Sequence, residues 1–271
     1  MPECLNLCEI NWDKYLNHCG VVDKSNELLK GKKRVYVGSY FCSQYFLSLK
    51  IDKLVEVVRD RNIKMTLVLP IFSEKDLNIA KSKILKILQT SEIMIDEITV
   101  NDFGMLTYIQ SNFDIKVNLG RLFFKDARDV RVNEYYLQKG KVNILSVLEN
   151  IVDISKINYI ELDETNKMID VNDNYNVAVH FPFCFMTTGN ICKYASINKS
   201  LECKFRPNDR CGQECSCVYE HYSEIYNGTP IELYRIGRTV YAYMTERSEI
   251  TNKEREIYFP FIEIVNCVGG K

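Results

Sequence analysis

Strand-like and helical segments alternate along most of this chain, and the alternation restricts the folds open to it. β-rich runs that end at turn or polar residues predict strands at residues 5–10, 34–37, 63–69, 95–100, 115–119, 158–160 and 177–179. Apolar residues at helical spacing predict helices at 51–58, 77–88 and 144–151, with a short helix after Gly104. No hairpin signal joins these strands. The pattern therefore predicts an α/β fold, a TIM-barrel-like parallel (β/α) barrel that is closed or nearly closed.

The last part of the chain has a different pattern. Two β-rich runs between Ile231 and Met244 flank Gly237-Arg238 and predict a hairpin. The apolar tail from Ile257 to Val265 is expected to pack against the barrel. A length of 271 residues is usual for one such barrel. We expect a single domain over residues 1–271 that includes a cysteine-rich segment, 180–221, and a C-terminal β-rich extension, 229–271.

The cysteine-rich segment carries the strongest chemical signal. It contains prolines and glycines together with six of the eleven cysteines, namely Cys184, Cys192, Cys203, Cys211, Cys215 and Cys217. An odd cysteine count and the lack of a signal peptide favour thiolates over disulfides. Cysteines crowded into a loop-rich stretch are typical of a zinc or iron–sulfur site, and buried free thiols are the plainer alternative. The residues alone favour zinc and iron–sulfur equally.

Residues with reactive side chains follow several of the expected strands. In a parallel barrel, chemistry collects where the carboxyl ends of the strands meet. The residues expected on that face are Cys42, Asp102, Arg121, Glu161 and His180. The cysteine-rich segment starts from the same face. Cys42 is therefore expected to meet the late cysteines, although it is far from them in the sequence.

Plainer structural roles exist for the charged residues of this set. Asp102 precedes Phe103-Gly104 and could cap the helix that follows. Arg121 and Glu161 could belong to a structural ion pair at the barrel mouth, and a buried histidine such as His180 is more often hydrogen-bonded than catalytic. These alternatives stay open from the sequence.

Composition excludes few kinds of function. The chain has 35 basic and 36 acidic residues, so its net charge of −1 gives no reason to expect a polyanionic partner. No apolar run is long enough to cross a bilayer, and a cytoplasmic protein without a membrane partner is expected. The His-Glu-x-x-His, Gly-x-Ser-x-Gly and phosphate-loop signatures of common hydrolases are missing.

Five stretches together resemble a known family. They are Val35-Tyr36-Val37-Gly38 running to Cys42-Ser43, Val100 to Gly104, Ile160-Glu161-Leu162, His180 through Cys184 and Gly189 to Cys192, and Cys211-Gly212-Gln213-Glu214-Cys215. These stretches resemble motifs of the collagenase-like U32-type peptidase family. They occur in the same order as in that family and extend over residues 35 to 220. The resemblance is strongest to its iron–sulfur branch, which includes proteins of anaerobic ubiquinone hydroxylation.

The resemblance implies a 4Fe-4S cluster. Its ligands would be Cys42, Cys192, Cys211 and Cys215, although Cys184, Cys203 or Cys217 could replace one of them, and zinc is the alternative metal. The residues that would shape the substrate side are Asp102, Arg121, Glu161 and His180.

The resemblance also implies a function. The chain would be an oxygen-independent hydroxylase of an aromatic ring or nucleobase, or the cluster-bearing subunit of one. A heterodimer with a larger family member and a small-molecule or RNA substrate are the implied partners. The alternatives are a non-catalytic partner with a structural or electron-transfer site, and a peptidase, which only the family name suggests.

Overall fold

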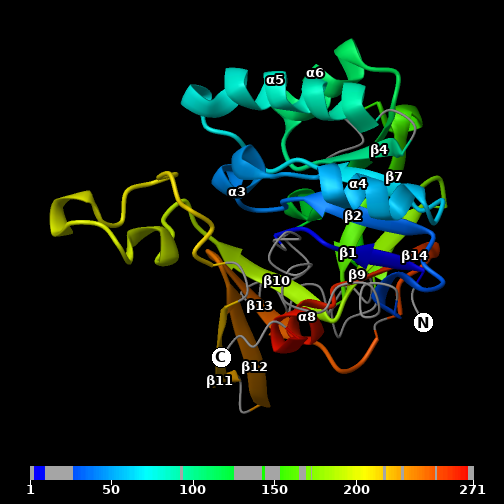
Figure 1. Ribbon diagram of the computed structural model, residues 1–271. Helices are drawn as coiled ribbons and strands as arrows, with labels where there is room; N and C mark the ends of the chain where they lie inside the picture. Colours follow the sequence, from blue (N-terminus) through cyan, green and yellow to red (C-terminus); the bar gives the residue numbers. More distant parts are fainter. Residues whose placement is uncertain are drawn as a thin grey trace.

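Eight parallel strands form a closed barrel in the computed structural model, which describes residues 3–9, 27–91, 94–124, 142–143, 153–164, 169–171, 173–215, 218–226, 229–247 and 249–267. The strands are β1 (Cys4–Asn6), β2 (Arg34–Gly38), β3 (Lys64–Val68), β4 (Ile95–Val100), β5 (Lys116–Leu119), β7 (Ile157–Asp163), β9 (Val177–Phe181) and β14 (Lys253–Tyr258). Spatial order follows chain order, and β14 closes the barrel by pairing with both β9 and β1 (Figure 1). The predicted α/β barrel is confirmed, and it is closed.

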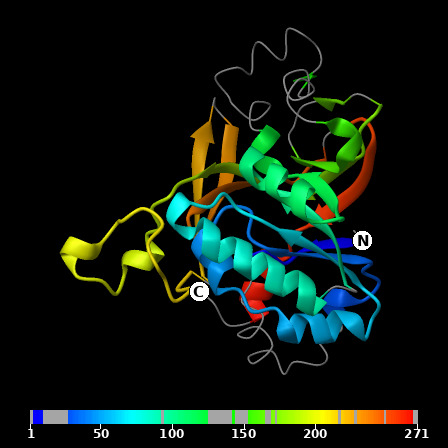
Figure 2. The same ribbon diagram turned by 90° about the horizontal axis from the view of Figure 1, so that it is seen from above.

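Helices pack around the outside of these strands (Figure 2). The α-helices are α3 (Ser43–Ser48), α4 (Asp52–Arg59), α5 (Glu74–Ser91), α6 (Phe103–Asn112) and α8 (Phe261–Cys267). Short 3-10 turns occur at η1 (Arg121–Phe124), η5 (Ile154–Lys156), η6 (Tyr194–Ser196) and η7 (Leu201–Cys203). The apolar residues of α4 that predicted a helix, Leu54, Val55 and Val58, are buried as expected of an amphipathic helix. The helix predicted at 144–151 lies outside the described residues.

A four-stranded antiparallel sheet is inserted between β9 and β14. Its strands are β10 (Phe183–Thr188), β11 (Tyr219–Tyr226), β12 (Thr229–Ile236) and β13 (Thr239–Tyr243), in the order β10-β13-β12-β11. The hairpin predicted around Gly237-Arg238 is confirmed as β12 and β13, with Ile236 paired to Thr239 across the turn. The connection between β10 and β11 carries the late cysteines and extends away from the barrel, in yellow in Figures 1 and 2.

Several strands differ from the sequence-based expectation. Strands β10 and β11 were not predicted, and the tail expected to pack on the barrel from Ile257 is the end of the barrel strand β14 followed by α8. The sequence of β14, Lys-Glu-Arg-Glu-Ile-Tyr, does not alternate apolar and polar residues because Arg255 joins a polar network with residues of other barrel strands. The predicted strand at 5–10 pairs only over Cys4–Asn6. A two-stranded pair, β6 (Val142–Asn143) and β8 (Ile169–Asp170), completes the described sheets.

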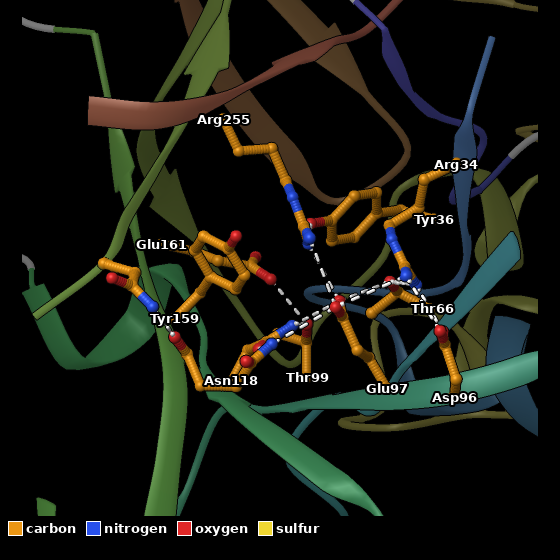
Figure 3. Close-up of polar contacts among 12 residues, drawn as sticks. Arg34, Tyr36, Thr66, Asp96, Glu97, Thr99, Asn118, Tyr159, Glu161 and Arg255 are labelled. Atoms are coloured by element: carbon orange, nitrogen blue, oxygen red, sulfur yellow. Dashed lines mark hydrogen bonds and ion pairs between the residues drawn. The ribbon is translucent and has the colours of Figure 1, made fainter.

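A buried polar network centred on Glu97 joins the amino-terminal halves of the barrel strands (Figure 3). Arg255 donates to both carboxylate oxygens of Glu97, at 2.8 and 3.2 Å, and Arg34 Nη2 lies 3.4 Å from Oε1. Thr66 and Asn118 donate to Oε2 at 3.1 and 3.3 Å. The Glu97 side chain is 3% exposed. Asn158 of β7 also donates to Oε1, at 3.2 Å, so side chains from five other barrel strands contact this one carboxylate.

None of the helices in the described part of the chain is long and apolar enough to cross a membrane.

Candidate metal centre

Four cysteines from distant parts of the sequence line one pocket. Cys42 follows β2, whereas Cys192, Cys211 and Cys215 belong to the connection between β10 and β11. The pocket lies at the carboxyl ends of the strands, since Glu9 from the segment after β1 and Cys42 from the segment after β2 both line it. The structure thus brings together the four cysteines that the sequence singled out as ligands.

Local hydrogen bonds hold Cys42 at the pocket wall. Its backbone N–H donates to Ser39 Oγ at 2.7 Å, and Ser39 Oγ donates in turn to Glu9 Oε1 at 2.8 Å. The sulfur accepts a hydrogen bond from Tyr45 N at 3.4 Å, so Cys42 is also the N-cap of α3. The direction of the Cys42 side chain is therefore set by the ends of two barrel strands and by a helix start.

The late cysteines are tied to the same region. Gln213, between Cys211 and Cys215, donates from Nε2 to Ser48 Oγ at 2.7 Å, which joins the connection to the end of α3. Lys199 donates to Arg210 O at 2.8 Å, immediately before Cys211. Contacts from α3 and from within the connection therefore hold the chain immediately before Cys211 and between Cys211 and Cys215.

Burial raises the pKa values of three of the pocket thiols. It raises the pKa of Cys42 to about 11, although the nearby positive charge of Arg238 lowers that pKa. Burial also raises the pKa values of Cys211 and Cys215, and the charges of Cys42, Cys192 and Cys211 raise that of Cys215 further. Without a cation the thiols of Cys42, Cys211 and Cys215 would be neutral at pH 7, so metal binding would have to release their protons.

The side chains of the pocket fit an iron–sulfur cluster in type and number, because four cysteine thiolates are the usual ligand set of such clusters. Among the described residues, no group of three or more His, Cys, Asp or Glu side chains is positioned to hold a metal ion. A tetrahedral zinc site needs sulfur atoms only about 4 Å apart, since each Zn–S bond is about 2.3 Å. A cluster with several metal ions spaces its four ligands more widely, so a pocket lined by four cysteines suits a cluster better than a single zinc ion.

The other cysteines differ in their surroundings. Cys184 is buried in β10, where it pairs with Ala242, and Cys203 is half-buried in η7. Neither is among the residues that line the pocket. Cys217 lies outside the described residues. Of the three alternative ligands, the two that can be located are thus not part of the pocket wall.

Two of the residues expected on the substrate side, Glu161 and His180, contact each other inside the barrel. His180 Nε2 lies 3.0 Å from Glu161 Oε2, and Tyr40 donates to the same oxygen at 2.7 Å. Thr99 donates to the other oxygen, Oε1. Glu161 and His180 are at most 1% exposed. They form a closed hydrogen-bonded group in the carboxyl-terminal half of the barrel.

Arg121 pairs with Asp163 and not with Glu161, the structural ion pair that the sequence had left open, whereas Asp102 caps a helix as its position allowed. Arg121 forms a fully buried ion pair with Asp163 and donates to Phe183 O at 2.7 Å. Asp102 is the N-cap of α6 and accepts from Met105 N at 2.9 Å. Neither of them, and neither Glu161 nor His180, lines the cysteine pocket. A catalytic role for these four residues stays a prediction.

Replacing Glu161 with glutamine is expected to change how stability depends on pH. Burial raises the pKa of Glu161 to about 7 from its ordinary 4.5, although hydrogen bonds from Thr99 and Tyr40 lower it. The folded protein therefore binds this proton more tightly than the unfolded chain does, and ionisation of Glu161 lowers stability as pH rises from 4.5 to 7. The full loss corresponds to about 3 kcal/mol.

The free energy of unfolding of Glu161→Gln should thus rise relative to wild type by about 3 kcal/mol across this window. Urea unfolding of both proteins below and above the window measures the difference. Titrating groups that do not contact Glu161 are common to both proteins, so their contributions largely cancel, and repeating the comparison in a His180→Gln background removes the contacting imidazole. A difference that stays constant with pH would contradict the assignment.

Two residues of the pocket wall, Glu9 and Arg238, were not anticipated. Glu9 is half-buried between Ser39 and Tyr241, and the partial loss of solvent raises its pKa. The rule that barrel strands end at the site could have found Glu9, but the predicted first strand ran on to residue 10 and included it. Arg238 had no signal, because nothing in the sequence indicates that the hairpin turn reaches the cysteines.

The fold and the pocket define a class of protein: a closed parallel (β/α) barrel in which four cysteines surround one pocket at the carboxyl ends of the strands. Comparisons with protein-family models, curated proteins and solved structures found no match for the chain. Membership of the U32-type family therefore stays a prediction from the five motifs.

Proposed function

We propose that the protein is an iron–sulfur protein of the U32-type peptidase-like family, with a 4Fe-4S cluster on Cys42, Cys192, Cys211 and Cys215. The observation that carries the proposal is the shared pocket, in which one early and three late cysteines meet. Thiols that were only buried for packing would have no reason to gather from two separate segments around a single opening. Four thiolates are also the number that such a cluster requires.

We propose further that the protein is an oxygen-independent hydroxylase of an aromatic ring or nucleobase, or the cluster-bearing subunit of one that pairs with a larger family member. The position of the pocket supports this, because barrel enzymes carry out their chemistry at the carboxyl ends of the strands. When bound, the cluster would supply electron transfer at a potential set by burial and hydrogen bonding. Glu161, with a pKa near 7, is suited to hold or release a proton at neutral pH.

A structural or electron-transfer role for the metal site is the second candidate. It is favoured by the way the pocket joins parts of the fold: the segment after β2, the long connection and the hairpin turn all meet there. A metal centre at such a junction could be retained for folding, since structural metal contributes on the order of 10 kcal/mol in zinc peptides.

Metal analysis with cysteine variants tests the cluster. After anaerobic purification or reconstitution, wild type is expected to contain about four iron and four acid-labile sulfide per chain. Cys42→Ser and Cys211→Ser should lose most of this content and the associated visible absorption. Cys203→Ser is the matched control, because Cys203 lies in the same connection but does not line the pocket. It should keep the cluster.

The same proteins separate the candidate functions. About one zinc per chain without sulfide would replace the cluster proposal by a zinc site, and wild type that binds neither metal would reject both. If Cys211→Ser loses the far-ultraviolet circular dichroism of the barrel together with iron, the structural role is favoured. A folded Cys211→Ser barrel without hydroxylation activity favours catalysis.

A further inference from the structure

The turn of the β12–β13 hairpin forms part of the wall of the cysteine pocket. Gly237, Arg238 and Thr239 all line it, together with the four cysteines. At Gly237 the backbone comes so near the site that an added Cβ would lie 3.5 Å from Cys215 Sγ. The antiparallel sheet therefore brings a third segment of the chain to the two segments that supply the cysteines.

Arg238 joins those two segments through one guanidinium group. Its Nε donates to Phe41 O at 2.8 Å, and Nη2 donates to the same carbonyl. Its Nη1 donates to Asn208 Oδ1 at 2.9 Å. Phe41 directly precedes Cys42, and Asn208 lies between Cys192 and Cys211. The planar fork of an arginine is needed for such a bridge, since a lysine ammonium cannot hold both acceptors in the same fixed geometry.

Arg238 also places a positive charge at the pocket. Of the described residues that line it, Arg238 is the only lysine or arginine, whereas Glu9 and Asp209 are acidic. A cluster on four thiolates is anionic, and its reduction adds one more negative charge. A guanidinium held beside it stabilises the reduced state more than the oxidised state.

We propose that Arg238 is a positioning residue of the cysteine pocket, which holds the Cys42 segment against the late-cysteine connection and raises the reduction potential of the bound cluster. The part that concerns the potential rests on the proposed function, whereas the part that concerns positioning does not. No contact with substrate is assigned to Arg238.

The positioning role is tested in metal-free protein by the rate at which iodoacetamide alkylates Cys42, followed by mass spectrometry of the peptide. Arg238→Lys keeps the charge, and so its effect on the Cys42 thiol, but loses the fork. It should accelerate alkylation at least about tenfold, as expected from the loss of hydrogen bonds donated by a charged group. Asn208→Ala removes the hydrogen-bond acceptor of Arg238 Nη1 in the late-cysteine connection and should give a smaller acceleration. Arg235→Lys, an arginine of the same hairpin that does not line the pocket, should leave the rate unchanged.

The tuning role is tested by redox titration of the loaded proteins. Arg238→Met should shift the midpoint potential to more negative values, while Arg238→Lys stays near wild type because it keeps the charge. Wild-type alkylation rates in both Arg238→Lys and Asn208→Ala would overturn the positioning role. An unchanged midpoint in Arg238→Met would overturn the tuning role alone. Wild type without iron would overturn the tuning role together with the proposed function, and the alkylation rates would still decide the positioning role.

Discussion

Replacing Glu97 with alanine is expected to destabilise the barrel by about 3–5 kcal/mol, because it would leave two arginines buried without their shared carboxylate. Arg255 and Arg34 are 13% and 10% exposed at their side chains, and both contact Glu97. Burial alone would raise the pKa of Glu97, but the hydrogen bonds from Arg255 and the charges of Arg34 and Arg255 hold it below its usual value. The carboxylate is therefore charged at neutral pH, and its removal takes away charge as well as hydrogen bonds.

Asp96→Ala is the matched control for this prediction. Asp96 neighbours Glu97 in β4 and also pairs with Arg34, with an Nη1–Oδ1 distance of 2.6 Å, but its side chain is 38% exposed. An ion pair that water can reach is worth no more than about 1 kcal/mol. Urea unfolding of the two variants should thus give clearly different losses. Equal losses would show that burial does not govern the network in Figure 3.

Gly38→Ala is expected to cost at least about 3 kcal/mol, which is a large share of the stability of a domain. Gly38 ends β2 with a φ of +121°, a backbone conformation that alanine rarely adopts. An added Cβ would lie 2.2 Å from Val68 O of the neighbouring strand. The carbonyl belongs to a barrel ladder and cannot move aside without breaking the pairing of β2 with β3.

The change should also affect the site, because Gly38 leads directly into the segment that carries Cys42. We expect Gly38→Ala to unfold at lower urea concentration and, where it folds, to bind less iron than wild type. Gly189→Ala is the control, since its methyl group would meet nothing closer than 4.0 Å. Gly38→Ala with the stability of wild type would mean that the close approach to Val68 does not exist in solution.

Much of the barrel could be predicted from local patterns. Runs such as Arg34–Gly38 and Ile95–Val100 are β-rich and end at turn residues, and α4 buries one apolar face. The type and approximate bounds of each of these elements can therefore be predicted from its own residues. The meeting of Cys42 with Cys211 and Cys215 also followed from the sequence. It needed only the order of the strands and the rule that parallel strands end on one face.

The partners of the charged residues could not be predicted in this way. Arg121 pairs with Asp163, and Glu161 contacts His180 and Tyr40, through side chains that come from β7, from β9 and from the segments after β2 and β5. Which of them meet depends on the register between strands and on the closure of the barrel. For the same reason β14 was missed, because its arginine is buried by an ion pair across the barrel and not by hydrophobicity.

The sequence by itself determined the alternation of strands and helices, the hairpin around Gly237-Arg238 and the crowding of thiols in one late segment, because these depend on residues close together along the backbone. Only the tertiary structure decided that the hairpin turn reaches the thiols, and that it brings Arg238 into the wall of their pocket. Contacts of that kind depend on how an inserted sheet packs on a closed barrel. No local pattern of residues encodes that packing.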